Sequence, residues 1–176
     1  MRPWWTPSRS KRTPRSPSTH AGFDAGKKIN GRKRHLLTDT LGLLLTVLVT
    51  PASTTDRDGA RTLLPTATGR FRRLARVWAD GGYTGHLTDW TTQHLGLALD
   101  IVRRPSDVQG FQALPRRWVV ERSFAWRLRS RRLVRDYERR TDTSEAVIRW
   151  SMIALMNRRL AARQHLRHRS LPRPAT

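Results

Sequence analysis

The feature that most constrains the fold of this chain is a pair of β-like runs joined by a tight turn. The runs are Arg34–Thr38 and Leu43–Thr50, and the turn between them is Asp39–Gly42, which together predict a β-hairpin. The second run is almost wholly apolar, which is typical of a strand that is buried on both faces.

Helical and strand-like segments follow the hairpin in turn. Thr55 or Asp56 can cap a helix, and Pro65 is expected to end it because proline interrupts helical hydrogen bonding. The remaining expected elements, in chain order, are a strand ending at Asp80 before a Gly81-Gly82 turn, a helix over Leu87–Leu95, a strand within 97–105, a helix after Pro115 with Val120, Phe124 and Leu128 at helical spacing, and a helix over 141–166 capped by Thr143 or Ser144. This order of elements indicates an α/β fold.

The two ends of the chain differ from its middle. The first 20 residues show no apolar period, and four prolines break any regular element there: Pro3, Pro7, Pro14 and Pro17. We therefore expect a basic arm over 1–19, one folded domain over 20–165 and a disordered basic tail over 166–176.

The charge balance favours an anionic polymer as the partner. The chain has 35 Lys and Arg against 13 Asp and Glu, a formal net charge of +22, and nucleic acid is the simplest match. An acidic membrane surface is the alternative, but no apolar run has membrane-spanning length and no basic amphipathic anchor opens the chain. The excess of Arg over Lys fits either phosphate binding or a GC-rich genome. Without cysteine or a signal-peptide pattern, disulfides and thiolate metal sites are excluded and a cytoplasmic location is expected.

Asp80 is the first candidate for chemistry. It ends an expected strand and two glycines follow it, a position at which open α/β sheets bind ligands. Glycines would let a phosphate or a metal ion approach closely. The alternative is a turn aspartate that accepts hydrogen bonds from its own loop amides, which is common in Asp-Gly pairs.

Glu121 is the second candidate. Arg117 lies four residues before it on the same helix face, and an ion pair between them would contribute only tenths of a kcal/mol. Apolar side chains surround the glutamate in the sequence: Trp118, Val119, Val120, Phe124 and Trp126. A partly buried glutamate needs a partner, and a cation or a metal ion would serve. The six histidines lack paired-ligand spacing, so a zinc site is not expected.

Two basic segments are candidates for DNA phosphate contact. The first precedes and enters the hairpin and comprises Lys27, Lys28, Arg32, Lys33, Arg34 and His35. Strand alternation would place Arg32 and Arg34 on one face and Lys33 and His35 on the other. The alternative is an edge strand guarded by charge. The second segment is the cationic helix after Pro115, whose candidates are Arg117, Arg122, Arg127 and Arg129.

Five segments together resemble bacterial insertion-sequence transposases of the DDE type. They are GKKINGRKRHLLTDTLGLLL, TTDRDGARTLL, VWADGGYTG, LPRRWVVERSFAW and RRTDTSEAVIRWSMIALMNRRL, and they cover roughly residues 20 to 163. The resemblance implies a ribonuclease H-like mixed sheet flanked by helices, in which three carboxylates hold two divalent metal ions. It matches the family's second aspartate with Asp80 and its glutamate, in an Arg-x-x-x-Glu context, with Glu121.

The wider signature of related families is not met. Those families place a tyrosine three residues before the arginine and a lysine seven residues after the glutamate. This chain has Leu114 and Leu128 at those positions, and Arg127 or Arg129 could replace the missing cation.

The resemblance also implies a chemistry and partners. Carboxylate and phosphate oxygens select Mg²⁺ or Mn²⁺, and two such ions can support phosphodiester cleavage and then attack of the freed 3′ hydroxyl on target DNA. The implied partners are the ends of the element and target DNA, with two protomers pairing the two ends as a homodimer. The resemblance also implies that the protein is located in the bacterial cytoplasm, in association with the nucleoid.

The family's first aspartate is missing from its expected place. That aspartate lies on the first strand in a stretch like Val-Asp-Ser-Gln-Ser-Val-Lys-Thr, whereas this chain has WWTPSRSKRT before the hairpin. The codons of Trp4, Trp5 and Thr6, read one base earlier, must contain GTG and then GAC, which encode Val-Asp, and the next six residues permit the rest. We therefore hypothesise that residues 1 to about 15 are the first strand translated out of frame, the alternative being an unrelated basic arm. Neither Asp24 nor Asp39 is expected to replace the missing ligand.

Three functions fit the sequence. The resemblance favours a transposase, and in this copy a defective one that lacks the first strand. The alternatives are a non-catalytic nucleic-acid-binding protein held by Arg–phosphate contacts and a ribonuclease H-like nuclease with another substrate.

Overall fold

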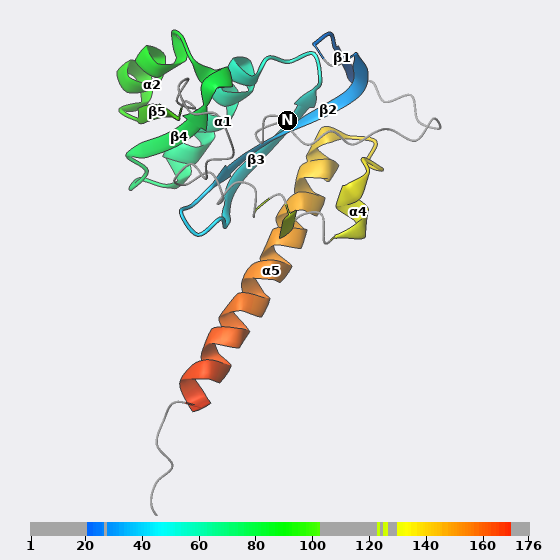
Figure 1. The fold of residues 1–176 in the computed structure, drawn as a ribbon, viewed down its shortest axis with the longest axis vertical. Helices are drawn as coiled ribbons and strands as arrows, with labels where there is room; N and C mark the ends of the chain where they lie inside the picture. The colour runs from blue at the N-terminus through cyan, green and yellow to red at the C-terminus, as the bar shows by residue number, and fades with distance from the viewer. Residues whose placement is uncertain (1–20, 27, 103–122, 124, 127–129, 170–176) are drawn as a thin grey trace, which may run out of the picture.

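The computed structural model describes residues 21–26, 28–102, 123, 125–126 and 130–169. The elements within them, in chain order, are β1 (Gly22–Asp24), β2 (Ile29–Thr38), β3 (Leu44–Pro51), α1 (Asp56–Arg70), β4 (Arg76–Asp80), the 3₁₀ turn η1 (Gly81–Tyr83), α2 (Leu87–Leu95), β5 (Ala98–Val102), α4 (Arg131–Val134) and α5 (Thr141–Arg169). The expected α/β class is confirmed. Figure 1 shows the β2–β3 hairpin between two groups of elements, with α1, β4, β5 and α2 on one side and α4 and α5 on the other.

The strands form two sheets within the described residues. The order β1-β2-β3 makes a three-stranded antiparallel sheet, and β4 pairs with β5 in parallel. The family resemblance implies one mixed sheet, whereas here the antiparallel and parallel pairs are separate. The short strand β1 was not expected, because three residues carry too little pattern to be recognised.

The hairpin lies where the sequence predicts it. The carboxylate of Asp39 accepts hydrogen bonds from the amides of Leu41 (2.9 Å) and Leu43 (2.7 Å), which closes the turn from inside. Gly42 supplies the positive φ of 79° that the turn requires. Strand β2 begins at Ile29, earlier than the expected start, because its basic first half is buried too.

Strand β3 is buried on both faces, as its apolar sequence predicts. Leu48 packs against the core formed with α1 and β4, while Val47 and Val49 pack against Leu133 and Ile148 of α4 and α5. The hairpin therefore lies between two hydrophobic clusters, one for each group of elements in Figure 1.

Helix α1 contradicts the expected end at Pro65. Thr55 caps the helix as predicted, since its hydroxyl oxygen accepts a hydrogen bond from the amide of Asp58 at 3.2 Å. The helix nevertheless continues through Pro65 to Arg70. Ala67, beyond the proline, is fully buried in the first cluster, and this packing outweighs the missing hydrogen bond.

Helix α5 begins at the predicted residue but without the predicted cap, and it ends later than predicted. Thr143 and Ser144 are not its cap, because the helix begins at Thr141 and the amide of Ser144 already donates to the carbonyl of Arg140 at 3.2 Å. Ser144 is buried instead of capping. The helix continues to Arg169, so its last turn enters the range 166–176 that was expected to be disordered.

Two further expectations concern helices. The helix after Pro115 lies mostly outside the described residues, although Ser123, Ala125 and Trp126 are helical. Among the described residues, no helix is long and apolar enough to span a membrane.

Candidate active site

Asp80 ends β4 at the carboxyl ends of the two parallel strands, where it aligns with Val102 of β5. Its Oδ1 accepts a hydrogen bond from the amide of Gly82 at 3.0 Å, and the side chain caps η1. The turn hydrogen bond that the sequence offered as an alternative is therefore present. This hydrogen bond engages Oδ1 of Asp80, whose carboxylate is half-buried at the carboxyl ends of the strands. Ligands bind at that edge of the sheet in α/β folds.

Asp56, the first residue of α1, lies beside Asp80. A Cβ atom built on Gly82 would lie 3.2 Å from Oδ1 of Asp80 and 3.7 Å from Oδ2 of Asp56, so the bare glycine leaves a small cradle between the two carboxylates. Burial raises the pKa of Asp80 to about 6, and the negative charge of Asp56 adds to the rise, although the Gly82 hydrogen bond opposes it. The two groups are thus electrostatically coupled.

Lys33 on β2 supplies the positive charge nearest to Asp56. Its Nζ lies 3.3 Å from Oδ1 of Asp56 and 3.8 Å from Oδ2 of Asp24, and it donates to the carbonyl of Thr54 at 2.6 Å. The Asp56 contact is an ion pair without hydrogen-bond geometry, since Oδ1 of Asp56 is buried and accepts no hydrogen bond. Three partners therefore hold this ammonium group inside the protein.

Tyr83 and His35 are buried near the carboxylates of Asp56 and Asp80. Tyr83 is buried, and burial together with the charges of Asp56 and Asp80 raises the pKa of its phenol well above the ordinary value. Burial lowers the pKa of His35, whose Nε2 lies 2.9 Å from the hydroxyl of Thr50. A neutral ring and a neutral phenol are therefore the favoured states of these two side chains near neutral pH.

The basic residues of β2 are buried within the protein. Arg32, Lys33, Arg34 and His35 are 1%, 8%, 2% and 2% exposed, whereas contact with a phosphate needs a solvent-accessible side chain. The expected alternation is confirmed, because Lys33 and His35 face α1 while Arg32 and Arg34 face the segment before α5. Protein groups already surround these four side chains in this structure, and the phosphate contact expected of them stays a prediction.

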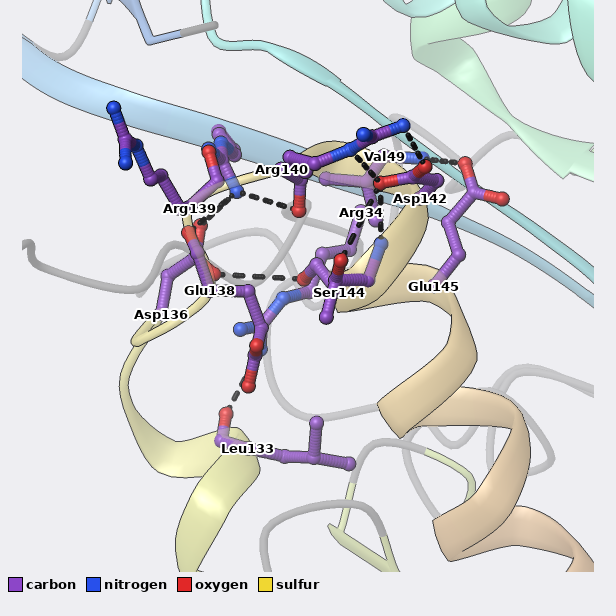
Figure 2. A network of polar contacts seen from close by, with 12 residues as sticks. Arg34, Val49, Leu133, Asp136, Glu138, Arg139, Arg140, Asp142, Ser144 and Glu145 are labelled. Atoms are coloured by element: carbon purple, nitrogen blue, oxygen red, sulfur yellow. Dashed lines mark hydrogen bonds and ion pairs between the residues drawn. The ribbon is translucent and has the colours of Figure 1, made fainter. Parts of the chain in front are cut away.

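The two buried arginines bind backbone carbonyls around the start of α5. Arg32 donates from Nη2 to the carbonyl of Arg139 (2.6 Å) and from Nη1 to those of Glu138 (3.0 Å) and Arg140 (3.3 Å). Figure 2 shows Arg34 directed toward Leu133, whose carbonyl accepts from Nη1 at 2.8 Å. These contacts attach the 133–140 segment to β2.

The other candidate residues divide between the surface and the part of the chain that is not described. Lys28 is exposed. Glu121 lies outside the described residues, and so do the remaining basic candidates: Lys27, Arg117, Arg122, Arg127 and Arg129.

Two residues that were not candidates from the sequence lie near the Asp80 turn: Asp56 and Arg57. The sequence indicates Asp56 only as a possible helix cap, and the run Thr-Thr-Asp-Arg-Asp does not reveal that it faces Asp80. Arg57 is exposed, and its Nη1 lies 3.5 Å from the position of a Cβ on Gly85, in the loop after η1. The available signal was that Asp56 is an acidic residue a few positions after the buried strand β3.

The donors present suit a hard divalent cation. Asp56 and Asp80 offer carboxylate oxygens, and the cradle above Gly82 leaves space beside them. Within the described residues, no group of three or more His, Asp and Glu side chains is arranged to hold a metal ion.

Comparison with known proteins identifies the family. A family model of the transposase DDE domain matches residues 5–156. Comparisons with curated proteins and with solved structures each returned no match. The matched range begins inside the N-terminal arm and includes both Asp80 and Glu121. Because the match spans most of the chain, this protein belongs to the family of transposases that carry a DDE domain.

Proposed function

We propose that this chain derives from a metal-dependent insertion-sequence transposase that cleaves DNA at the element ends and transfers the strand to target DNA. The observation that carries the proposal is the half-buried carboxylate of Asp80 at the end of β4, beside a glycine that leaves room for a ligand. We further propose that the complete domain is ribonuclease H-like, with the family's first strand completing its sheet.

Asp80 and Glu121 are the proposed metal ligands. Mg²⁺ or Mn²⁺ would supply charge stabilisation at the attacking and leaving oxygens of the phosphodiester. We assign ligation to Asp80 rather than Asp56 because Asp56 already forms an ion pair with Lys33. The role of Asp56 is electrostatic, since its charge favours the protonated form of Asp80 until a cation arrives.

Contact with DNA is assigned to accessible cations. Lys28 and Arg57 are exposed, and Arg57 approaches the loop that follows the Asp80 turn. The further proposed contacts are Lys27, Arg117, Arg122, Arg127 and Arg129. Because these contacts neutralise phosphates, DNA binding should weaken steeply as salt is added.

A defect in this copy is part of the proposal. No aspartate precedes Asp24 in the sequence, so the carboxylate that would bridge two metal ions is missing. The frame hypothesis explains the loss, and the nucleotide sequence of codons 4 to 12 tests it directly. If their minus-one reading does not spell the Val-Asp stretch, the N-terminal segment is an unrelated basic arm.

A cleavage assay with Mg²⁺ on DNA that carries the element ends tests the function. The frame-restored chain should cut this DNA, the chain as it stands should cut little or not at all, and Asp80→Ala in the restored chain should abolish cutting. Asp89→Ala is the matched control, because Asp89 is an exposed aspartate on α2. A restored chain that binds DNA in a salt-sensitive way and never cuts it would support the second candidate, a non-catalytic DNA-binding protein, which the net charge of +22 favours.

A further inference from the structure

Exposed arginines gather where α1 ends and β4 begins. Residues 59–79 contain five arginines and no aspartate or glutamate. Four of the five lie within seven residues of one another, and all four are exposed. We define the 70–76 patch as these four side chains: Arg70, Arg72, Arg73 and Arg76.

A hydrogen-bonded turn fixes the position of the patch. The amide of Phe71 donates to the carbonyl of Ala67 at 2.8 Å, and the amide of Leu74 donates to the carbonyl of Phe71 at 2.9 Å. Arg72 and Arg73 are therefore the two central residues of a tight turn. The guanidinium of Arg70 lies over the ring of Phe71, 5.8 Å from its centroid, so the patch is partly ordered before any partner binds.

Interactions within the protein account for only half of the patch. Arg70 stands in the last turn of α1, where the helix dipole favours a cation, and Arg76 pairs with Asp100 at 2.8 Å. The side chains of Arg72 and Arg73 form no ion pair or hydrogen bond with any residue that the structure describes. Two adjacent guanidinium groups repel each other, and an anion bound between them would relieve that repulsion. Their planar donors match the oxygens of a phosphate.

The patch lies away from the candidate active site. Arg76 begins β4 and Asp80 ends it, so four steps of about 3.3 Å put them about 13 Å apart along the strand. The turn stands at the amino ends of the parallel strands, whereas Asp80 stands at their carboxyl ends. Duplex DNA, which rises about 3.4 Å per base pair, would span this distance in about four base pairs.

We propose that the 70–76 patch is a second DNA surface, which binds backbone phosphates of duplex DNA away from the bond that is cleaved. Arginine–phosphate contacts carry no sequence information, so the patch holds the duplex without selecting its sequence. The proposal rests on DNA as the partner in the proposed function and does not depend on cleavage.

Binding of the full chain to a short duplex that lacks the element ends, measured over a range of salt concentrations, tests the proposal. The test variant combines Arg70→Gln, Arg72→Gln and Arg73→Gln. At about 0.9 per phosphate contact, the slope of log K against log salt should become shallower by about 2.7. Circular dichroism checks that the variant folds.

A control variant removes the same charge elsewhere. It combines Arg131→Gln, Arg135→Gln and Arg139→Gln, which are exposed positions in and after α4, in the other group of elements in Figure 1. The control should change the slope by less than about 1, because it removes none of the proposed contacts. Equal changes in the two variants would overturn the proposal, and so would an unchanged slope in the patch variant.

Two further measurements identify the partner and separate this proposal from the proposed function. Lysine at positions 70, 72 and 73 should keep most of the slope, because the three charges remain. If the glutamine variant keeps its DNA binding but loses binding to vesicles of anionic lipid, the patch binds an acidic membrane surface and the proposal is wrong. A shallower slope in the glutamine variant supports the patch even if the frame-restored chain never cuts DNA, a result that would refute only the cleavage.

Discussion

Replacing Arg32 by methionine removes the most connected buried cation of the described chain while keeping an unbranched apolar stem of similar length. The guanidinium pairs with the carboxylate of Asp136 at 3.3 Å and donates to three consecutive backbone carbonyls. Both side chains of the pair are almost fully buried, at 1% and 3% exposed. Arg32→Met would therefore leave a buried carboxylate without its cation and three carbonyls without this donor.

The expected loss follows from this burial. Removing one partner of a buried ion pair costs about 3–5 kcal/mol, because the remaining charge stays desolvated and uncompensated. A protein of this size has a free energy of unfolding of about 5–15 kcal/mol, so the substitution would remove a large part of it. Arg76 provides the matched control: it pairs with Asp100 at 2.8 Å, but the two side chains are 58% and 39% exposed. Arg76→Met should cost less than about 1 kcal/mol.

Urea unfolding followed by circular dichroism measures both losses. A double variant, Arg32→Met with Asp136→Leu, should regain part of the lost free energy of unfolding, since it removes the unpaired charge. The reasoning would be refuted if Arg32→Met cost no more than Arg76→Met. It would also fail if the double variant lost more free energy of unfolding than the two single variants lose together.

Two more predictions concern the candidate site. Because burial raises the pKa of Asp80 to about 6, the folded state binds an extra proton between about pH 4 and 6, and the free energy of unfolding should fall by about 1 kcal/mol as pH rises through this window, after allowance for screening of a half-exposed group. Asp56→Asn should lower the pKa of Asp80 in an NMR titration, and an unchanged pKa would contradict the coupling between the two carboxylates. Gly59→Ala should destabilise the protein by about 1–3 kcal/mol in urea unfolding, because the added Cβ would overlap the His35 ring. The control is Gly69→Ala in the same helix, whose Cβ would meet no atom within 4 Å and which should be neutral or stabilising. Similar effects of the two substitutions would argue against the clash.

Local patterns predicted most elements of the described fold. The Asp39 turn, the Thr55 cap and the helix Leu87–Leu95 each depend on residues a few positions apart, and the structure has all three. Pro65 shows where local rules stop, because burial of Ala67 against distant residues keeps α1 intact beyond the proline. A propensity describes the chain in water, whereas tertiary packing decides the outcome in a core.

The candidate site was predictable only in part, for the same reason. Asp80 was recognisable from the strand and glycines around it, which are its neighbours in sequence. Its relation to Asp56 depends on how α1 packs against β4, and no spacing rule encodes that. The cation opposite Asp56 comes from β2, more than twenty positions earlier in the chain.

Strand β2 links the two halves of the molecule through the alternation of its side chains. Its basic residues read as a DNA-binding segment because sequence alone cannot show whether a strand of cations faces water or protein. In the fold, one face of the strand holds carbonyls before α5 through Arg32 and Arg34, and the other holds Asp56 through Lys33. A one-residue shift of register between β2 and β3 would exchange the two faces and disrupt both sets of contacts at once. The position of α5 is thus tied to the same strand that sets the charge beside Asp80.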